Sequence, residues 1–549
     1  MKRSTFGRWT AALLALLLLA SSCSGESTDD ASTDTEDTSA ETEDSGDAAA
    51  DTGGTDTGGT DTGDTADTGD SADSADTADT GGGEVYDDPR GGIFTEFQAD
   101  FDRSHPFGGL DSFCVPHDEA ADRQATEPGI EPDSISVHQI RQQLENLVEI
   151  GFGIDVGDVN LMFDTFAEVI NEECGGIRGR QVVMSESSYD ILSPELEQVR
   201  ITNCITATED DNAAVVLNST GFQGTATLCV AEEHETPLLT TQGLSDDFMT
   251  RGGGRLLTLD FSLNESLRFM VERLHEEGEL EGKTIAVVSA DVPGQPEAVQ
   301  DGLVGTLEEL GYEVAVNDEI GCGGEATCTQ GVPESVSNLK DAGVDVVFPT
   351  LSVTSLPGYV SEMVTQGFAP GDVQFYNSNF ASQAGDLVSS KVAAFGGEAA
   401  GELYNGAVIV DAAAAGNFRL EGTEIPAFNE LCLDTYAERT GVEYDWYQEE
   451  GNTPSGMVAN VCALVRMAAR AIYDAGDNPT RDDITAALAA LGAVDTNNMI
   501  PASIGDGKYT LADAAQTMTW TYPCAIEGAA FDEFNTCIVM DDNYQDVER

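Results

Sequence analysis

Helical and extended patterns alternate along the middle of the chain. From Val159 to Ile170 the apolar residues recur at the spacing of one helix face, and the pattern stops at Gly175 and Gly176. This predicts a helix over 159–174 that ends in a glycine cap. Short apolar runs flanked by turn residues lie around it, as is typical of buried parallel strands. We predict such strands over 135–140, 181–185, 213–217 and 237–241.

A second series of the same kind begins after Leu259. A further stretch from Gly401 onward, too long to be a tail, has a strand pattern at 406–410 and helices at 427–440 and 455–475. About 460 residues have this texture, which is more than one core usually holds. We therefore predict the α/β class, with two doubly wound, Rossmann-like lobes. The second series has strands over 284–289, 312–316, 344–350 and 373–379, and helices over 265–277, 296–310, 334–342 and 356–366.

The first residues have the order of a signal peptide, assigned to residues 1–22. Lys2, Arg3 and Arg8 precede an apolar run that leads through small residues to Cys23. The sequence LASSC resembles the lipobox of bacterial lipoproteins, which implies lipidation of Cys23; cleavage near Ala20 with a free thiol is the alternative. The run is shorter than the roughly 20 residues of a spanning helix, and we expect no later stretch to span. We predict an extracytoplasmic protein, lipid-anchored to the cell membrane.

Residues 23–92 are predicted to form a disordered acidic tether. From Ser24 to Asp88 the chain is mostly Asp, Thr, Gly, Ser and Ala, with 22 of the 100 acidic residues, so it has no core to bury. Residues 93–133 contain aromatics and Cys114, and we expect an ordered extension there. From Pro89 onward, 78 acidic and 21 basic residues leave a charge of about −57. This charge opposes nucleic acid and anionic headgroups as partners.

Ten cysteines follow Cys23, an even number that predicts up to five disulfides outside the cytoplasm. The two pairs closest in sequence, Cys322 with Cys328 and Cys524 with Cys537, are the favoured candidates. The chain has no C-x-x-C motif and its five histidines are scattered, so we predict no metal site. We predict no cofactor either.

Three phrases carry a resemblance to a known family. AEVINEECGGIRGRQVVMSESSYD, GKTIAVVSADVPGQPEAVQDGLVGTLEELGYEVA and VSNLKDAGVDVVFPTLSVTSLPGYVSEMVTQGFAP follow one another in order. They resemble the type 1 periplasmic binding proteins, specifically the branched-chain amino acid type of ABC transporter substrate-binding protein. The resemblance implies a three-strand hinge, with crossings near residues 258, 400 and 498. Lobe 1 would then be 134–258 with 401–498, and lobe 2 would be 259–400 with 499–549.

In parallel sheets, ligands bind beyond the carboxyl ends of strands. In the first lobe, Ser219, Thr220 and Gln223 follow a predicted strand and match the family's site for a ligand carboxylate; helix capping is the alternative. Thr241 and Gln242 follow the next strand, with the same alternative. Phe222 is a candidate for stacking on the ligand, although an aromatic residue is more often part of the core.

In the second lobe the candidates also follow strands. Asp291 is a candidate for a ligand ammonium group, with a solvated loop acid as the alternative. Ser352 and Thr354 follow VVFPTL. Asn379 falls where amino acid binders of the family carry an acid. A neutral amide there puts an α-amino acid in doubt and leaves amides, urea-like solutes, polyols and small acids open.

These features predict a binding protein. The chain has no G-x-S-x-G, HExxH, P-loop or G-x-G-x-x-G motif, so we do not expect an enzyme. We predict a monomeric lipoprotein that captures a small polar solute, such as an amino acid, amide or small carboxylate, and delivers it to ABC permease subunits. A sensory role with a separate receptor and a tethered structural role at the surface are the alternatives.

Overall fold

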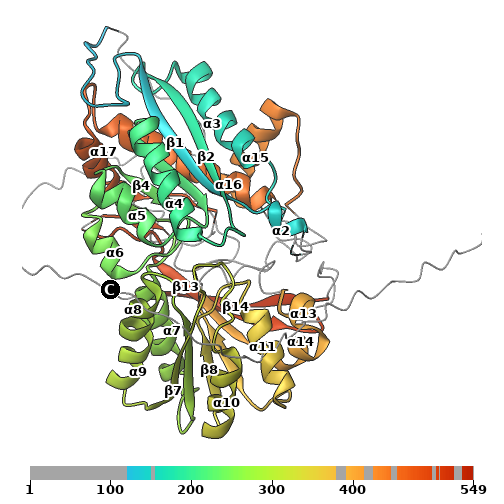
Figure 1. Cartoon of the computed structure of the whole chain (residues 1–549). Helices are drawn as coiled ribbons and strands as arrows, with labels where there is room; N and C mark the ends of the chain where they lie inside the picture. Colours follow the sequence, from blue (N-terminus) through green and yellow to red (C-terminus); the bar gives the residue numbers. More distant parts are fainter. Residues whose placement is uncertain are drawn as a thin grey trace, which may run out of the picture. The chain divides into compact units, whose positions relative to one another are not determined.

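The computed structural model describes residues 120–149, 152, 155–378, 391–412, 425–446, 454–497, 502–505, 507–524 and 535–547. Within these ranges the chain forms two large sheets, each flanked by helices (Figure 1). We call the five-stranded sheet with its helices the first lobe and the seven-stranded sheet with its helices the second lobe. The predicted fold class, α/β with parallel sheets in two lobes, is confirmed.

All five strands of the first sheet run parallel, in the order β2-β1-β3-β4-β5. The three short strands β3, β4 and β5 are buried along their whole length, because helices cover both faces of a parallel sheet. The strands are β1 (Ser134–Gln143), β2 (Gln181–Asp190), β3 (Val215–Thr220), β4 (Leu238–Thr240) and β5 (Leu256–Thr258).

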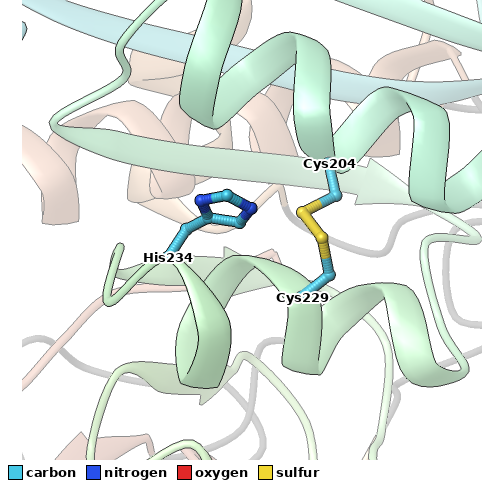
Figure 2. A group of neighbouring side chains, drawn as sticks. All are labelled: Cys204, Cys229 and His234. Carbon is cyan, nitrogen blue, oxygen red and sulfur yellow. A yellow bond between two sulfur atoms is a disulfide. The ribbon is translucent and has the colours of Figure 1, made fainter.

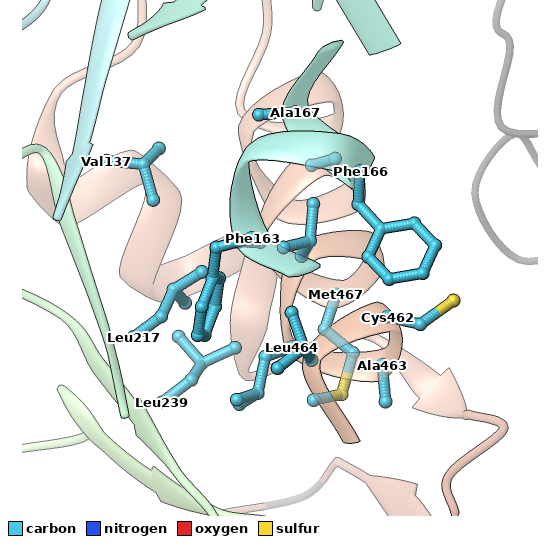
Figure 3. Packing of buried hydrophobic residues seen from close by; sticks show 14 of the residues in the cluster. Val137, Phe163, Phe166, Ala167, Leu217, Leu239, Cys462, Ala463, Leu464 and Met467 are labelled. Atoms are coloured by element: carbon cyan, nitrogen blue, oxygen red, sulfur yellow. The ribbon is translucent and has the colours of Figure 1, made fainter. Parts of the chain in front are cut away.

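Helix α3 (Val159–Cys174) has the bounds that its apolar spacing predicts. The Asp158 side chain accepts from the Leu161 N–H at its start, and Gly175 ends it with a φ of 69°. Phe163 and Phe166 are fully buried between the sheet and α16 (Pro454–Asp474) (Figure 3). Burying such a side chain stabilises the fold by roughly 1.5–3 kcal/mol.

The remaining helices of the first lobe, apart from α2 beyond the end of β1, lie on the two faces of its sheet. One apolar cluster joins α3, α15 and α16 to the sheet, and a second cluster contains residues of α4, η2 and α6. These helices and π-helical turns are α2 (Asn146–Glu149), α4 (Leu196–Ile205), η1 (Thr206–Asp210), α5 (Thr225–Leu228), η2 (Cys229–Glu233), α6 (Asp246–Arg251), α15 (Ala427–Thr440) and α17 (Arg481–Leu488).

The second sheet has the order β14-β13-β10-β9-β8-β6-β7. Its strands from β6 to β10 run parallel, and β13 and β14 add an antiparallel edge. The strands are β6 (Ile285–Ala290), β7 (Val314–Ile320), β8 (Val346–Pro349), β9 (Gln374–Asn377), β10 (Val408–Asp411), β13 (Ala514–Thr521) and β14 (Cys537–Asp546).

Helices cover both faces of the second sheet (Figure 1). One cluster contains residues of α10, α11, α13 and α14, and the other contains residues of α7, η3 and α9. A capping box between Ser262 and Glu265 starts α7. The helices are α7 (Leu263–Glu276), α8 (Gln295–Ala298), η3 (Val299–Val304), α9 (Gly305–Glu309), α10 (Val332–Ala342), α11 (Leu356–Thr365), α13 (Lys391–Gly396) and α14 (Glu398–Tyr404).

The chain passes from the first core to the second between Leu259 and Phe261, close to the predicted residue 258. The other two predicted crossings are wrong. β10 pairs with β9 and β13, so the return lies after Ala412 rather than near 400. An apolar strand pattern does not show which sheet the strand joins. The predicted strand at 406–410 therefore belongs to the second lobe and not to the first.

The last crossing also lies later than predicted. The short strands β11 (Gly492–Ala493) and β12 (Ser503–Ile504) pair with each other, and Leu511 still belongs to the first core, whereas Ala512 belongs to the second. The crossing is therefore at residues 511–512 instead of 498. Here Leu511 N donates to Thr258 O at 3.0 Å, so the first and last crossings run side by side.

Helix α16 is long and apolar enough to span a membrane, contrary to our expectation that no later stretch would be. Its packing accounts for this, because 83% of its most apolar window is buried inside the protein. It lies at the centre of the first core, against α3, α15 and α17. A mostly apolar helix of this kind is expected where the core surrounds it.

Four disulfides join described residues. Cys322–Cys328 and Cys524–Cys537 are the two pairings that sequence proximity favoured. The other two connect helical segments of the first lobe: Cys204–Cys229 joins α4 to η2, and Cys432–Cys462 joins α15 to α16. Cys174 is also disulfide-bonded.

The described part of the predicted extension, residues 120–133, packs on the first lobe. Ile130 is fully buried and bridges to Ile135 of β1. Arg180 Nε donates to Glu131 O at 2.8 Å, and Gln124 N donates to Asn478 Oδ1 at 2.7 Å. These contacts make residues 120–133 a part of the lobe surface.

Candidate functional site

The carboxyl ends of three strands in the first sheet are tied together by Asn218. Its Nδ2 donates to Ile140 O and to Thr220 O, both at 2.8 Å. Its Oδ1 accepts from Thr240 Oγ1 at 2.8 Å. Asn218 and Thr240 are fully buried. This network fixes the ends of β1, β3 and β4, which place the predicted binding residues.

Of the predicted hydroxyls in this lobe, two already have partners. Thr241 Oγ1 donates to Ser219 O at 2.8 Å, and Thr220 Oγ1 accepts from Gln142 N at 3.3 Å. The Ser219 hydroxyl differs, because it is buried and has no hydrogen-bond partner in the described part of the chain. Burying a polar atom without a partner costs free energy. Ser219 is therefore the hydroxyl with capacity left for a ligand.

The structure gives different positions to the other predicted residues of this lobe. Phe222 is fully buried in the apolar cluster beside Ile140 and Leu196, so the stacking prediction is wrong and the core alternative holds. Gln223 and Gln242 are half-buried. Gln242 Nε2 lies 3.4 Å from Thr241 Oγ1, at the limit of a hydrogen bond.

Sequence reasoning missed Glu197, which lies at the start of α4. Its Oε1 accepts from Thr225 N at 2.6 Å and from the Thr225 hydroxyl. Arg200 Nη1 lies 3.7 Å from its other oxygen. A carboxylate of the protein thus binds Thr225, at the start of α5 and two residues beyond the candidate Gln223. No local signal marks Glu197, because it and Thr225 meet only in the folded chain.

A buried tyrosine, Tyr189, bonds to the backbone of the loop that follows β3. Tyr189 donates to Gly221 O at 2.7 Å and is fully enclosed by the first lobe. Burial raises the pKa of Tyr189, with the Arg200 guanidinium acting in the opposite direction. The hydroxyl stays protonated at neutral pH and remains a donor.

In the second lobe, the predicted residues hold a disulfide loop, residues 322–328. Asp291 Oδ1 accepts from Cys322 N at 2.6 Å, although the residue is exposed. Ser352 Oγ lies 3.3 Å from Ala326 O, and Thr354 Oγ1 donates to the same oxygen at 2.8 Å. These contacts give Asp291, Ser352 and Thr354 a structural task at the strand ends.

The disulfide loop also touches the first lobe. Leu196 N donates to Gly324 O at 3.2 Å, and Ala326 packs against the apolar cluster that contains Phe222. Loop 322–328 is therefore a direct contact between the strand ends of both lobes. Asn379 lies outside the described residues; in neighbouring Asn377, Nδ2 donates to the Tyr404 hydroxyl at 2.7 Å.

Two groups of side chains within the described ranges are close enough to hold a metal ion. One consists of Cys204, Cys229 and His234 (Figure 2), and the other of Asp291, Cys322 and Cys328. In each group the two sulfur atoms are joined in a disulfide. Because a thiolate is the species that binds metal, neither group is a metal site in this oxidised form.

Ser187, His138 and Asp211 have the separations of a catalytic triad. His138 Nε2 lies 2.9 Å from Ser187 Oγ, and Nδ1 lies 2.9 Å from Asp211 Oδ2. The imidazole is fully buried, so it has no access to a leaving group. The arrangement joins β1, β2 and the end of η1, and we read it as structural.

Comparisons with known proteins agree on the fold. A family model described as Periplasmic binding protein matches residues 162–521. The fatty acid ABC transporter substrate-binding protein from Thermomonospora curvata is 14% identical, covering 76% of this chain and 95% of its own, with a TM-score of 0.53. The substrate-binding periplasmic protein from Ralstonia solanacearum is 17% identical, covering 74% and 100%, with a TM-score of 0.52.

A solute binding protein of an ABC transporter from Rhodopseudomonas palustris BisB5, in complex with 3,4-dihydroxy benzoic acid, is 13% identical. The similarity covers 76% of this chain and 99% of that chain, with a TM-score of 0.51. No curated protein matches the chain. At these identities, the likeness to solved structures shows the fold.

Proposed function

Since this chain belongs to the periplasmic binding protein family, we propose that it captures a small polar solute between its lobes and delivers it to an ABC importer. The family consists of extracytoplasmic solute-binding proteins rather than enzymes. Several solved structures of this fold are solute-binding components of ABC transporters. A permease is accordingly the proposed protein partner, and the chain acts as a monomer.

The observation that carries the proposal is the Ser219 hydroxyl. It is 3% exposed, it lies at the carboxyl end of β3, and it has no partner among the described residues. Ligands of open α/β sheets bind beyond this edge. The Thr241 hydroxyl donates to the Ser219 carbonyl and holds this backbone position in place, so the Ser219 hydroxyl is preorganised for a polar group of the solute.

A thermal-shift screen of the full chain tests capture. The library contains amino acids, amides, urea, polyols and small carboxylates. A solute at 100 times its dissociation constant adds about 2.7 kcal/mol to the free energy of unfolding. One chemical class should raise the Tm, and Ser219→Ala should weaken that response. Ser337→Ala, on the exposed face of α10, is the matched control and should leave it unchanged.

Small-angle scattering with and without the solute tests closure of the lobes. Capture predicts a smaller radius of gyration in the bound state, because periplasmic binding proteins close by hinge motion. If the folded chain responds to no solute and its scattering does not change, the proposal fails and a tethered structural role replaces it. Binding with closure but without uptake through a permease favours the sensory role.

The anchoring proposal rests on Cys23 and its lipobox. Several acyl chains, at about 0.8 kcal/mol per buried methylene, would hold the N-terminus on the membrane. Cys23→Ser should move the protein from the membrane fraction to the soluble fraction of the producing cells and should abolish labelling by a fatty acid. Labelling that persists in Cys23→Ser contradicts lipidation at this residue.

A further inference from the structure

Two buried side-chain amides of the second lobe have polar atoms without hydrogen-bond partners among the described residues. Gln516 is 2% exposed, and neither its side-chain oxygen nor its nitrogen has a hydrogen-bond partner in the part of the chain that the structure describes. Among the described residues it is the one side chain with two such atoms. Asn377 is 3% exposed, and its Oδ1 also has no partner within the described ranges. Native proteins satisfy nearly all buried polar groups, so these atoms need an explanation.

Strand pairing places the two amides on one face of the sheet. Asp411 of β10 lies opposite Gln516 of β13, and Ile409 lies opposite both Asn377 and Met518. Because side chains alternate along a strand, Asn377, Asp411 and Gln516 share a face. β9 ends at Asn377 and β10 ends at Asp411, so the shared position is the carboxyl edge of the parallel strands.

The backbone is irregular at the same position. The register between β13 and β14 shifts between Gln516 and Met518, from a pairing with Tyr544 to a pairing with Met540. Such irregularities occur often next to functional sites, where they redirect side chains or end pairing. This is a second observation, independent of the missing hydrogen bonds, at the same edge.

We propose that Gln516, together with Asn377, binds an uncharged carboxamide or urea-type group of the solute. This inference rests on the proposed function and assigns the solute class. The group supplies an N–H donor for Gln516 Oε1 and a carbonyl acceptor for Gln516 Nε2, which satisfies both atoms. Asn377 Oδ1 accepts a further N–H.

A carboxylate fits this position poorly. It has no donor to offer when ionised, so it leaves Gln516 Oε1 unsatisfied. It would also lie next to Asp411, which is fully buried, and two acids in one buried site repel each other. The position of Gln516 therefore favours an uncharged group of the solute.

Matched pairs of probes test the solute class on the full chain. Acetamide is compared with acetate, and glutamine with glutamate, and urea is added as a further probe. The proposal expects that an amide or urea probe raises the Tm in a concentration-dependent way and that its matched carboxylate does not. A response to a carboxylate without a response to any amide overturns the proposal but leaves solute capture intact.

Substitutions then test the residue. Gln516→Met keeps the volume and removes both polar atoms, and it should weaken binding of the responding amide at least tenfold. Gln300→Met, at an exposed glutamine of η3, is the matched control and should bind normally. If Gln516→Met does not fold, Gln516→Glu replaces it; losing the donor should weaken binding by a similar factor.

The outcomes separate this inference from the proposed function. If the wild-type chain binds an amide and Gln516→Met binds it equally well, the buried amide serves a water molecule and the inference is wrong. If no probe and no member of the wider solute library binds the wild-type chain, the proposed function itself fails. Loss of amide binding in the variant, with normal binding by the control, supports both.

Discussion

His138 Nδ1 lies 2.9 Å from Asp211 Oδ2, with the ring fully buried in the first lobe and the acid half-buried at the end of η1. Burial lowers the pKa of His138 below its ordinary 6.5, while the Asp211 carboxylate acts in the opposite direction. The folded protein therefore favours the neutral imidazole over the imidazolium.

The free energy of unfolding should decrease as the pH falls below about 6.5. The unfolded chain takes up a proton there, whereas the folded chain takes it up only at lower pH. The contribution of His138 is complete above the unfolded pKa and is lost as the pH falls toward the folded pKa, at about 1.4 kcal/mol per unit of difference. Urea unfolding at pH 8.0 and 5.5, compared with His138→Asn, measures it. Equal losses in both proteins would contradict this assignment.

Ser219→Ala should leave the free energy of unfolding nearly unchanged, because the hydroxyl that it removes has no partner among the residues that the structure describes. Thr240→Val should lower it by about 1–3 kcal/mol, because it leaves Asn218 Oδ1 buried without its donor. Urea denaturation of both variants measures the difference. A large loss in Ser219→Ala would mean that the hydroxyl has a structural partner.

Asp291→Ala should lower the free energy of unfolding by about 1 kcal/mol, since it removes the acceptor of the Cys322 N–H. Asp341→Ala, at an exposed acid of α10, is the matched control. Thermal unfolding with and without cationic amines measures both the structural role of Asp291 and its binding of an ammonium group. Unchanged stability together with loss of amine binding would restore its assignment to a ligand ammonium.

Replacing Cys322 and Cys328 by serine should lower the free energy of unfolding by about 2 kcal/mol through the loss of a short closed loop. The variant should also release its solute faster, because loop 322–328 bonds to Leu196 of the other lobe. Stopped-flow dissociation measures this rate. Replacing Cys524 and Cys537, which join segments of the second lobe, should lower stability without changing release.

The Tm should rise as salt is added. From Pro89 onward the chain carries 78 acidic and 21 basic residues, and self-repulsion of such a net charge destabilises the compact state. Raising the ionic strength from 0.1 M to 1 M shortens the screening length from about 10 Å to about 3 Å. Differential scanning fluorimetry in KCl, with choline chloride as a second salt, checks this. A flat profile in both salts would exclude self-repulsion as a major term.

Local pattern predicted most single elements well. The helices at 159–174 and 427–440 have the predicted bounds, because their caps and apolar spacing are local. β13 and β14 were missed. They are separated by 15 residues in sequence, and no short turn between them signals that they pair as an antiparallel hairpin. The crossing assigned to residue 400 failed for the same reason, since sheet membership depends on distant partners.

In the candidate site, too, local features could be predicted from the sequence and long-range contacts could not. Strand ends correctly located Ser219, Thr241, Asp291 and Ser352 at the carboxyl edges of the sheets. Their hydrogen-bond partners were not predictable, because Cys322 is 31 residues from Asp291. Gln516 was missed because it lies inside an antiparallel strand, where no turn or cap marks a binding residue.

Helix α16 has a consequence for biogenesis. Its 21 residues are apolar enough to stop in a translocating channel during export. Arg466 lies near its middle, and an arginine at the centre of a segment raises the cost of lateral insertion by about 2.5–3.5 kcal/mol. In the folded protein, burial lowers the pKa of Arg466 to about 10. We therefore expect the Arg466 charge, which is costly to bury in the mature core, to oppose insertion of this segment into the membrane during export.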